Sequence, residues 1–495
     1  MIRSLLNKKE FGDFQTPLNL AVEISKLVKS LDINPKSVLE PSCGTGTFLK
    51  AALNQFNDIV SLYGLDVNED YIEKASESVS EFKDKLSIKI EVGDFFLTDW
   101  TKKVKNYPKP ILVIGNLPWV TIAALSTING SNAPVKTNQR GLKGIDIITG
   151  KSNFDISEWM LMRLFDAANA TEATLAFICK TSVARKLLKY AKLKALNLIN
   201  AYIFKINAKE HFNVAVNASV FICTFMSNNN SYDCKVFNDL NINSYIATIG
   251  FRNGILLADA EKFDNYRDLL GKSQYIWRSG VKHDASKILE LSQSNGVLKN
   301  KLGENVDVED NYIYPLVKGS DLANDRWQSA GKSIIITQQN LNESTDFLQV
   351  KAPKLWKYLK DHEDFFKQRA SRIYKNKSEF AMFGVGNYTF SGWKIAIAAL
   401  YKKLEFRLIS PLSRKPVIFD DTCYFIPFSN HDDAEQFWRV LNSNVVQEFL
   451  SSFIFWDEKR PITAEILNRL DVHIAERQLN KSCLKPIYSQ IEKDF

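Results

Sequence analysis

The chain has 495 residues, of which 45% are hydrophobic and 24% are charged, with a formal net charge of +8. This length favours two domains in an ordinary soluble globular protein, and no apolar run approaches the roughly 20 residues of a membrane helix. No secretory signal precedes the charged N-terminal residues and the six scattered cysteines form no CxxC pair, so a cytoplasmic protein without a zinc site or a disulfide framework is expected.

The first half alternates strand-like apolar runs with helical patterns. Helical patterns cover residues 20–31 and 71–82, and strands are expected at residues 37–40, 62–66, 88–92, 111–114, 174–179, 201–206 and 219–225. This alternation predicts an α/β domain with a parallel, doubly wound sheet. Only a short loop joins the last two runs, which predicts an antiparallel hairpin at the sheet edge.

A glycine-containing loop, Glu-Pro-Ser-Cys-Gly-Thr-Gly at residues 40–46, follows the first strand. Glycines let the backbone turn tightly and approach a ligand, and a doubly wound sheet binds nucleotide-like cofactors at this position. No Gly-Lys-Ser/Thr follows, so this is not a phosphate-binding loop of the ATPase kind.

Acidic residues end the next two strands. Asp66 follows the glycine loop by about 20 residues, where a carboxylate can accept hydrogen bonds from ribose hydroxyls. Asp94 and Phe95 end the third strand, where an acid and an aromatic ring can grip an adenine. Each of these acidic residues alone could equally be a solvated strand end. Acidic residues at three successive strand ends, Glu40, Asp66 and Asp94, are better explained by a shared binding site.

The fourth strand delivers Asn116, Leu117, Pro118 and Trp119 to its C-terminal end. The side-chain oxygen of Asn116 and the carbonyl of Leu117 can accept hydrogen bonds from an exocyclic amine on a planar ring, which would make the nitrogen more electron-rich. Pro118 would fix the turn and Trp119 would stack on the ring. The competing interpretation is an ordinary strand exit with a core tryptophan.

A polar stretch at residues 227–231 interrupts the alternation, and we expect a catalytic domain at 1–245 and a second domain at 246–495. Basic residues suited to DNA phosphates and base edges occur in a loop at 141–154, at 277–283 and at 367–377, although such runs are often solvated surfaces. The candidate DNA-binding residues are Lys143, Lys151, Arg278, Lys282, Arg369, Arg372, Lys375 and Lys377.

Taken together, Gln15-Thr16-Pro17, the loop at 40–46, Asp66, Asp94-Phe95 and residues 116–119 resemble the gamma-class (TaqI-like) adenine-N6 DNA methyltransferases of restriction–modification systems. The resemblance implies a Rossmann-like catalytic domain with S-adenosyl-L-methionine as cofactor. It implies a cofactor site made by Thr16, Pro17, Glu40, Pro41, Ser42, Cys43, Gly44, Asp66, Asp94, Phe95 and Pro118.

The resemblance also implies which residues contact the target base. Asn116 and Trp119 would handle an adenine flipped out of the duplex, and Phe212, in the segment 210–214, would pack on its other face. The alternative for Phe212 is a core phenylalanine. Leu117 stands where the family usually has a proline, and a leucine keeps the backbone carbonyl that the chemistry requires.

The second half resembles the family's C-terminal α+β target-recognition domain more weakly, at residues 314–322, 441–443 and 462–467. We therefore expect a site-specific adenine methyltransferase that needs no metal. Its expected partners are double-stranded DNA and a separate cognate restriction endonuclease, with no membrane. The alternatives are an RNA or protein-amide N-methyltransferase, and a DNA-binding member of a defence complex that has lost catalysis.

Overall fold

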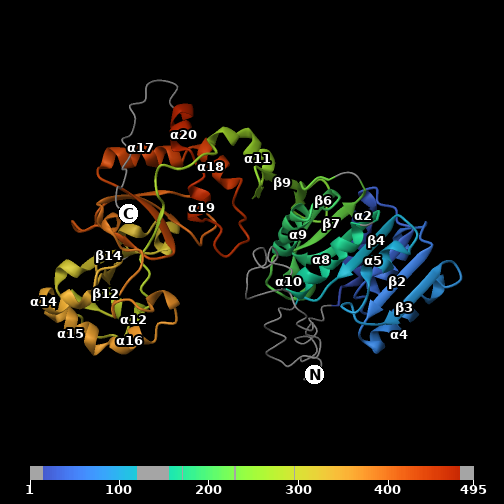
Figure 1. Cartoon of the computed structure of the whole chain (residues 1–495), viewed down its shortest axis with the longest axis horizontal. Coiled ribbons are helices and arrows are strands. Elements are labelled where there is room, and N and C mark those ends of the chain that lie inside the picture. The colour runs from blue at the N-terminus through green and yellow to red at the C-terminus, as the bar shows by residue number, and fades with distance from the viewer. Residues whose placement is uncertain are drawn as a thin grey trace. The chain divides into compact units, whose positions relative to one another are not determined.

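The computed structural model describes residues 15–119, 155–169, 171–227, 230–294, 296–329 and 331–479. Its helices and strands gather in two compact units, Met1–Glu261 and Lys262–Phe495 (Figure 1). Each unit has its own sheets and its own core, and each is described separately below.

The first unit is built on a ten-stranded sheet in the order β10-β9-β8-β6-β7-β5-β4-β1-β2-β3. Neighbours among the first five strands are parallel, which confirms the expected doubly wound, Rossmann-like α/β fold. These strands are β1 (Ser37–Glu40), β2 (Ser61–Asp66), β3 (Ser87–Val92), β4 (Ile111–Asn116) and β5 (Ala173–Lys180).

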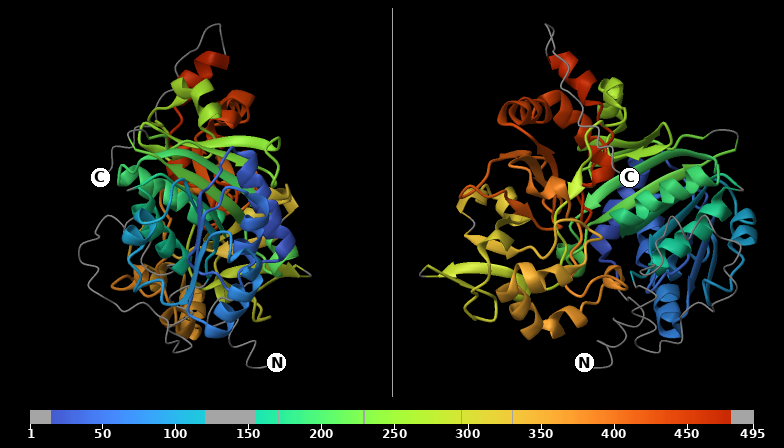
Figure 2. Two further views of the ribbon diagram at one scale, coloured as in Figure 1. Left: turned by 90° about the vertical axis from the view of Figure 1, so that its right-hand side faces the viewer. Right: turned by 60° about the vertical axis from the view of Figure 1, so that its left-hand side comes forward.

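Burial explains the strand sequences. β1, β4 and β5 lie inside the sheet and are almost entirely buried, and β4 and β5 are mostly apolar, whereas β3 forms the edge and consists of exposed and half-buried residues. Helices cover both faces of the sheet (Figure 2). They are α2 (Leu18–Ser30), α3 (Thr47–Gln55), α4 (Glu69–Ser78), α5 (Trp100–Lys105), α8 (Ile156–Ala168) and α9 (Thr181–Leu193), with a 3-10 turn, η1 (Ser80–Phe82), after α4.

Side-chain caps set several helix starts. The Asn68 side chain accepts hydrogen bonds from the N–H groups of Asp70 and Tyr71 at the start of α4, and the Asp155 side chain accepts one from Ser157 at the start of α8. The apolar face of α2, which includes Leu20, Ile24 and Leu27, is buried in the core against α3 and the sheet.

The expected hairpin forms, but it does not lie at the sheet edge. β6 (Leu198–Ile206) and β7 (Ala218–Phe225) pair antiparallel, and a short helix, α10 (Ala208–Phe212), lies in their connection. The edge prediction was wrong because three more strands extend the sheet beyond β6. These are β8 (Cys234–Phe237), which is parallel to β6, followed by β9 (Tyr245–Arg252) and β10 (Ile255–Leu257), each antiparallel to the strand before it.

Because of these three added strands, the boundary between the two units lies later in the chain than the expected boundary. The polar stretch at 227–231 leads into β8, so the sheet continues to Leu257 and the first unit ends at Glu261. The expected boundary between residues 245 and 246 would instead assign β9 and β10 to the second domain. α11 (Ala260–Asn265) spans the change of unit.

The second unit is α+β and contains two small sheets. The first has the order β11-β19-β16-β17 and is antiparallel, and the second has the order β13-β12-β15-β14-β18, in which only β14 and β18 are parallel. The strands are β11 (Arg278–Ser279), β12 (Glu290–Ser294), β13 (Val297–Lys299), β14 (Ile313–Val317), β15 (Lys332–Ile335), β16 (Trp393–Ala398), β17 (Arg407–Ile409), β18 (Ile418–Phe419) and β19 (Cys423–Phe428).

Short helices surround these sheets. α17 and α18 follow β19, and α14 and α15 bury Leu348, Leu355 and Leu359 in the core of the five-stranded sheet. The helices are α12 (Ser286–Leu289), α13 (Gly319–Ala323), α14 (Leu348–Lys351), α15 (Pro353–Asp361), α16 (Glu363–Lys367), α17 (His431–Leu441), α18 (Asn444–Ser451), α19 (Ala464–Leu467) and α20 (Val472–Leu479).

The 3-10 turns of this unit are η3 (Arg267–Leu269), η4 (Asp310–Tyr312), η5 (Trp327–Ser329), η6 (Thr345–Phe347), η7 (Arg372–Tyr374) and η8 (Asn387–Phe390). Over the described ranges of both units, every helix is too short or too polar to cross a bilayer.

Candidate functional site

The candidate site lies at the carboxyl ends of β1, β2, β3 and β4. Because these strands are parallel neighbours, their C-terminal residues meet at one edge of the sheet. Glu40 ends β1, Asp66 ends β2, and Asn116 ends β4, while Asp94 follows β3 by one residue beyond Gly93. The structure therefore brings these four predicted polar residues to the same edge.

The loop after β1 is held against the end of β2 by backbone hydrogen bonds. The Cys43 N–H donates to the Leu65 carbonyl (2.9 Å), and the Gly44 N–H donates to Asp66 Oδ2 (2.9 Å). The second carboxylate oxygen of Asp66 accepts from the Asn68 N–H (3.0 Å).

Gly44 is required by its backbone and by its neighbour. Its φ is +50°, and a Cβ atom there would lie 2.8 Å from Gln15 Oε1. Gln15, Thr16 and Pro17 directly precede α2, so the chain upstream of that helix lies beside the loop. Of the other predicted cofactor residues, Pro41 and Cys43 are buried, and Thr16, Pro17 and Ser42 are half-buried.

Glu40 is a buried carboxyl with unused hydrogen-bonding capacity. It is 3% exposed, and its Oε2 has no hydrogen-bond partner among the described residues. Burial raises the pKa of Glu40 well above its ordinary value, and the charge of Asp66 adds to the rise. A Cβ on Gly115 would lie 3.6 Å from Glu40 Oε1, so the carboxyl sits beside the residue that precedes Asn116.

The segment after β3 combines an exposed acid with an aromatic cluster. Asp94 is exposed, and its Oδ1 accepts a hydrogen bond from the Phe96 N–H (2.7 Å). Phe95 is 5% exposed and packs between Phe96 and Trp100, with ring centroids 5.4 and 5.0 Å away. The half-buried Phe96 ring stacks on Trp159 of α8 at 5.2 Å, a contact that the sequence analysis missed because α8 is distant in the chain.

The Asn116–Trp119 segment leaves β4 with its apolar side chains turned inward. Leu117 is 1% exposed, which gives the unexpected leucine a packing role, and Pro118 is half-buried. Trp119 is 9% exposed and packs edge-on against Phe212 of α10, with ring centroids 5.3 Å apart and the ring planes at 66°. The two aromatics predicted to flank a base thus lie together, and both pack against the core of the first unit.

A buried ion pair at the end of β5 was also missed by the sequence analysis. Lys180 ends β5, the strand beside β4, and its Nζ donates to Asp155 Oδ2 (2.6 Å), while Asp155 also caps α8. The available signal was a lysine directly after a strand that is otherwise entirely apolar.

The predicted DNA-binding residues have different environments. Lys143 and Lys151 lie outside the described residues. Arg278 lies in β11 with its guanidinium 4.6 Å from the Tyr388 ring, and Lys282 Nζ is 3.7 Å from Asp284. Arg372, Lys375 and Lys377 are exposed.

Arg369 differs from these residues because its guanidinium is engaged inside the unit. It donates to the backbone carbonyls of Phe366 (3.1 Å), Glu379 (2.8 Å) and Ala381 (2.7 Å), and it stacks 3.7 Å from the Tyr374 ring centroid. These contacts support a structural role, so the prediction that Arg369 contacts DNA loses support.

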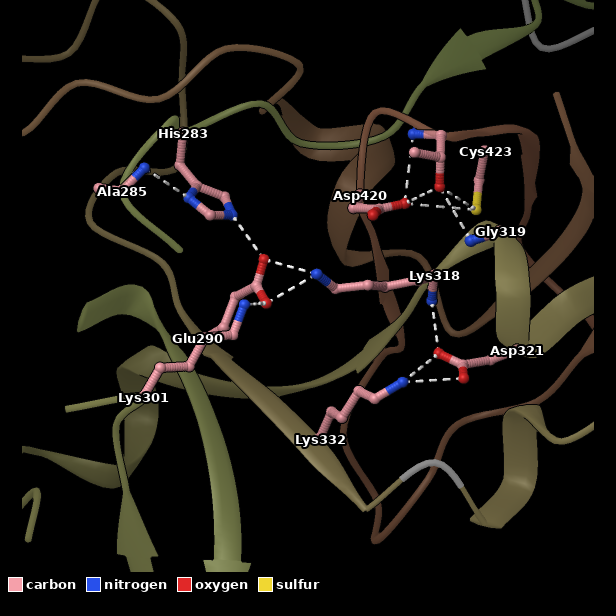
Figure 3. Close-up of polar contacts among 11 residues, drawn as sticks. His283, Ala285, Glu290, Lys301, Lys318, Gly319, Asp321, Lys332, Asp420 and Cys423 are labelled. Atoms are coloured by element: carbon pink, nitrogen blue, oxygen red, sulfur yellow. Dashed lines mark hydrogen bonds and ion pairs between the residues drawn. The ribbon is translucent and has the colours of Figure 1, made fainter. Parts of the chain in front are cut away.

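The segment 314–322 anchors a charged network in the second unit (Figure 3). Lys318 Nζ donates to both oxygens of Glu290 (2.7 Å each), and the Lys318 N–H donates to Asp321 Oδ2 (3.0 Å), which caps α13. Lys332 Nζ pairs with Asp321 (2.9 Å). Burial opposes ionisation of Glu290, but hydrogen bonds from His283, Lys301 and Lys318 hold its pKa well below the ordinary value.

Comparison with known proteins gives a consistent family. No model of a known protein family matches the chain. The chain is 44% identical over 468 residues to the Type II methyltransferase M.NspV of Nostoc sp., which covers 94% of this chain and 97% of that protein. It is 32% identical over 100 residues to the Type II methyltransferase M.AccI of Acinetobacter calcoaceticus, which covers 20% of this chain and 18% of that protein.

One solved structure supports the same fold. The Type IIL restriction–modification enzyme MmeI, determined in complex with DNA, matches with a TM-score of 0.51 and 14% identity, over 91% of this chain and 64% of that chain. At this identity the match concerns the fold alone.

Proposed function

The chain belongs to the Type II methyltransferases, and from this premise we propose that it is a site-specific DNA methyltransferase that modifies the N6 amino group of adenine with S-adenosyl-L-methionine as methyl donor. The observation that carries the proposal is the carboxyl edge of the sheet, where the Gly44 loop and Asp66 meet the strand that ends in Asn116. One edge thus offers both a cofactor loop and an acceptor for an amino group.

The residues at this edge fit the proposed cofactor. The glycine at position 44 leaves the loop backbone without a side chain, and the buried Glu40 oxygen lacks a partner among the described residues. Asp66 and Asp94 give the site a negative character, which suits a ligand that carries a sulfonium and an ammonium group, and the buried Glu40 adds an acceptor oxygen. Thr16, Pro17, Pro41, Ser42, Cys43, Phe95 and Pro118 complete the proposed cofactor site.

When bound, S-adenosyl-L-methionine supplies an electrophilic methyl group. Asn116 Oδ1 and the Leu117 carbonyl would accept hydrogen bonds from the adenine amino group and so draw its lone pair out of conjugation with the ring. This nitrogen would accept the methyl group that the bound cofactor would supply, and the amine proton would leave afterwards to solvent. The protein's own contribution is orientation and charge placement.

Trp119 and Phe212 would hold the target base. Because their rings are in contact, a base entering between them must separate them, and its stacking then replaces that contact. Extruding the base from the duplex costs a few kcal/mol, and stacking between Trp119 and Phe212 would offset part of this free energy.

Methyl transfer tests the proposal directly. The purified chain is incubated with methyl-labelled S-adenosyl-L-methionine and unmethylated genomic DNA, and the DNA is digested to nucleosides. We expect the label in N6-methyladenine. Asn116→Ala should lower transfer at least a hundredfold, in the range of losing one transition-state hydrogen bond, while Asn57→Ala, at an exposed turn, should keep the wild-type rate.

Other outcomes identify the alternatives. Label in RNA or in protein, with none in DNA, would favour an RNA or protein-amide methyltransferase. DNA binding without any transfer would indicate a member of a defence complex that has lost catalysis. The separate cognate endonuclease stays a prediction.

A further inference from the structure

The second unit contains a polar cavity of about 760 Å³. Its lining consists of residues 281–284, which precede α12, of Ser286, the first residue of α12, of Glu290 and Lys318, and of the segments 368–371 and 420–421. Part of its lining therefore comes from the network of Figure 3, and another part comes from the segment that leads into the basic residues 372–377.

The inner wall of this cavity is held in place by its own hydrogen bonds. His283 Nδ1 accepts from the Ala285 N–H (3.2 Å), which leaves the proton on Nε2, 3.5 Å from Glu290 Oε1. Asp420 accepts hydrogen bonds from the N–H (3.2 Å) and the hydroxyl of Thr422. His283, Glu290 and Asp420 are all more than nine-tenths buried, so this wall presents fixed polar groups.

The charge balance of the lining argues against a phosphate ligand. Four carboxylates, Asp284, Glu290, Asp420 and Asp421, face three cations, Lys282, Lys318 and Arg369. Lys318 is engaged by Glu290, and Arg369 is engaged by backbone carbonyls. Glu290 is itself engaged by Lys318 and Lys301, and Asp420 is engaged by Thr422. The acceptors that Asp421 and Gln368 bring to the lining are therefore the ones that suit a ligand that donates hydrogen bonds.

The cavity mouth adds further acceptors beside a basic segment. Gln368 is exposed and Ser371 and Asp421 are half-buried, and the exposed Arg372 and Lys375 follow within a few residues. A DNA-reading surface combines two kinds of side chain. Cations bind the phosphates, and neighbouring carboxylates and amides accept hydrogen bonds from the edges of the bases.

We propose that this cavity reads the exocyclic amino group of a base in the recognition sequence, adenine N6 or cytosine N4, with Asp421 and Gln368 as the reading side chains. Arg372 and Lys375 would hold the neighbouring phosphates. The inference rests on the proposed DNA methyltransferase function and adds to it the residues that determine sequence specificity.

The test maps methylated positions at base resolution. The full chain and its variants are incubated with S-adenosyl-L-methionine and unmethylated genomic DNA, and the modified motif is derived for each. Asp421→Ala and Gln368→Ala should each relax one base-pair position of the motif, with discrimination there falling about ten- to hundredfold. The wild-type base at the relaxed position, adenine or cytosine, identifies the amino group.

Two control variants separate base reading from general binding. Lys375→Ala should keep the motif and lower transfer at all sites together, with a salt dependence shallower by about one in log–log slope. Asp432→Asn removes a carboxylate whose side chain is 97% exposed outside the cavity, and it should leave both motif and rate unchanged. Thermal unfolding verifies that each variant folds.

Several outcomes would overturn the inference. If folded Asp421→Ala and Gln368→Ala both retain the wild-type motif at every position, the cavity does not read a base. If they lower transfer uniformly, as Lys375→Ala does, their contacts are with the backbone of DNA. If the wild-type chain methylates no DNA, the proposed function itself is contradicted. This failure can be told apart from failure of the base-reading proposal, because it is seen with the wild type alone, before any variant is compared.

Discussion

Gly44 and Asp66 show how single residues shape the candidate site. The Gly44 N–H is 2.9 Å from Asp66 Oδ2, so the loop after β1 is fixed to the end of β2 by one charge-assisted hydrogen bond. The positive φ disfavours a side chain at this position, and an added Cβ would force the Gln15 side chain to move. A side chain here would therefore disturb the loop that we propose to hold the cofactor.

Gly44→Ala should weaken cofactor binding by at least tenfold and destabilise the first unit by about 1 kcal/mol from the positive φ alone. Gly254→Ala is a matched control, since its φ is +77° but nothing lies within 4 Å of the added Cβ. It should carry the same backbone cost without loss of affinity. Isothermal titration with S-adenosyl-L-methionine and urea unfolding measure the two effects, and equal affinities of both variants would contradict the assignment of the loop.

Some residue placements follow from sequence and others do not. Asp66 and Asn116 could be placed at one edge because each ends a recognisable apolar strand in a parallel sheet. Arg369 could not be placed, because the carbonyls that bind it belong to residues brought together only by tertiary folding. The contact of Trp119 with Phe212 joins segments 93 positions apart, and only the family resemblance linked them beforehand.

At the scale of elements, burial decides which parts of the fold could be predicted. The seven strands expected in the first half all form, because apolar runs identify the buried strands and the apolar–polar alternation of residues 88–92 identifies the edge strand β3. β8, β9 and β10 were not expected, since they are short or half-exposed and follow a polar stretch that also fits a domain end. The two sheets of the second unit rest on pairings between distant short strands, which no local pattern indicates.

The Glu290 network joins several elements of the second unit. Glu290 begins β12, Lys318 precedes α13, and Lys301 follows β13. The Glu290 side chain is 8% exposed and Lys318 is 25% exposed, so loss of the carboxylate leaves Lys318 without its partner in a partly desolvated position, whereas Lys301 is half-exposed. Glu290→Gln should therefore destabilise the second unit by about 3 kcal/mol at neutral pH.

The pH dependence of this effect has a definite sign. The pKa of Glu290 is lowered from 4.5 in the folded protein, so the contribution of its carboxylate is complete above pH 4.5 and is lost as the pH falls below it. Urea unfolding of wild type and Glu290→Gln should therefore converge in acid. Glu435→Gln breaks an exposed pair with Arg439 and should cost less than about 1 kcal/mol; a similar loss in both variants would contradict a special role for Glu290.

At the scale of the whole molecule, each unit has its own apolar core. Leu20, Leu49 and Ile114 belong to the core of the first unit, and Leu289, Ile334 and Leu355 belong to that of the second. Cores of this kind allow each unit to unfold as a separate cooperative transition.

Calorimetry of the full chain should accordingly show two transitions. S-adenosyl-L-methionine at about one hundred times its Kd should stabilise only the transition of the first unit, by about 2.7 kcal/mol. Glu290→Gln should lower the midpoint temperature of only the other transition. The two results together would assign one transition to each unit. A single transition that moves with either change would show that the units unfold together.

The three added strands also bear on how such chains diversify. Since β9 and β10 complete the sheet of the first unit, a genetic crossover between Leu257 and Ala260 would transfer the second unit whole and leave the sheet intact. A crossover at residue 245 would pair β8 of one parent with β9 and β10 of the other, so the contacts of Val236 and Phe237 with Ala247 and Tyr245 would join residues that did not evolve together. Exchange of second units between related chains would thus be tolerated at this joint and selected against a few residues upstream.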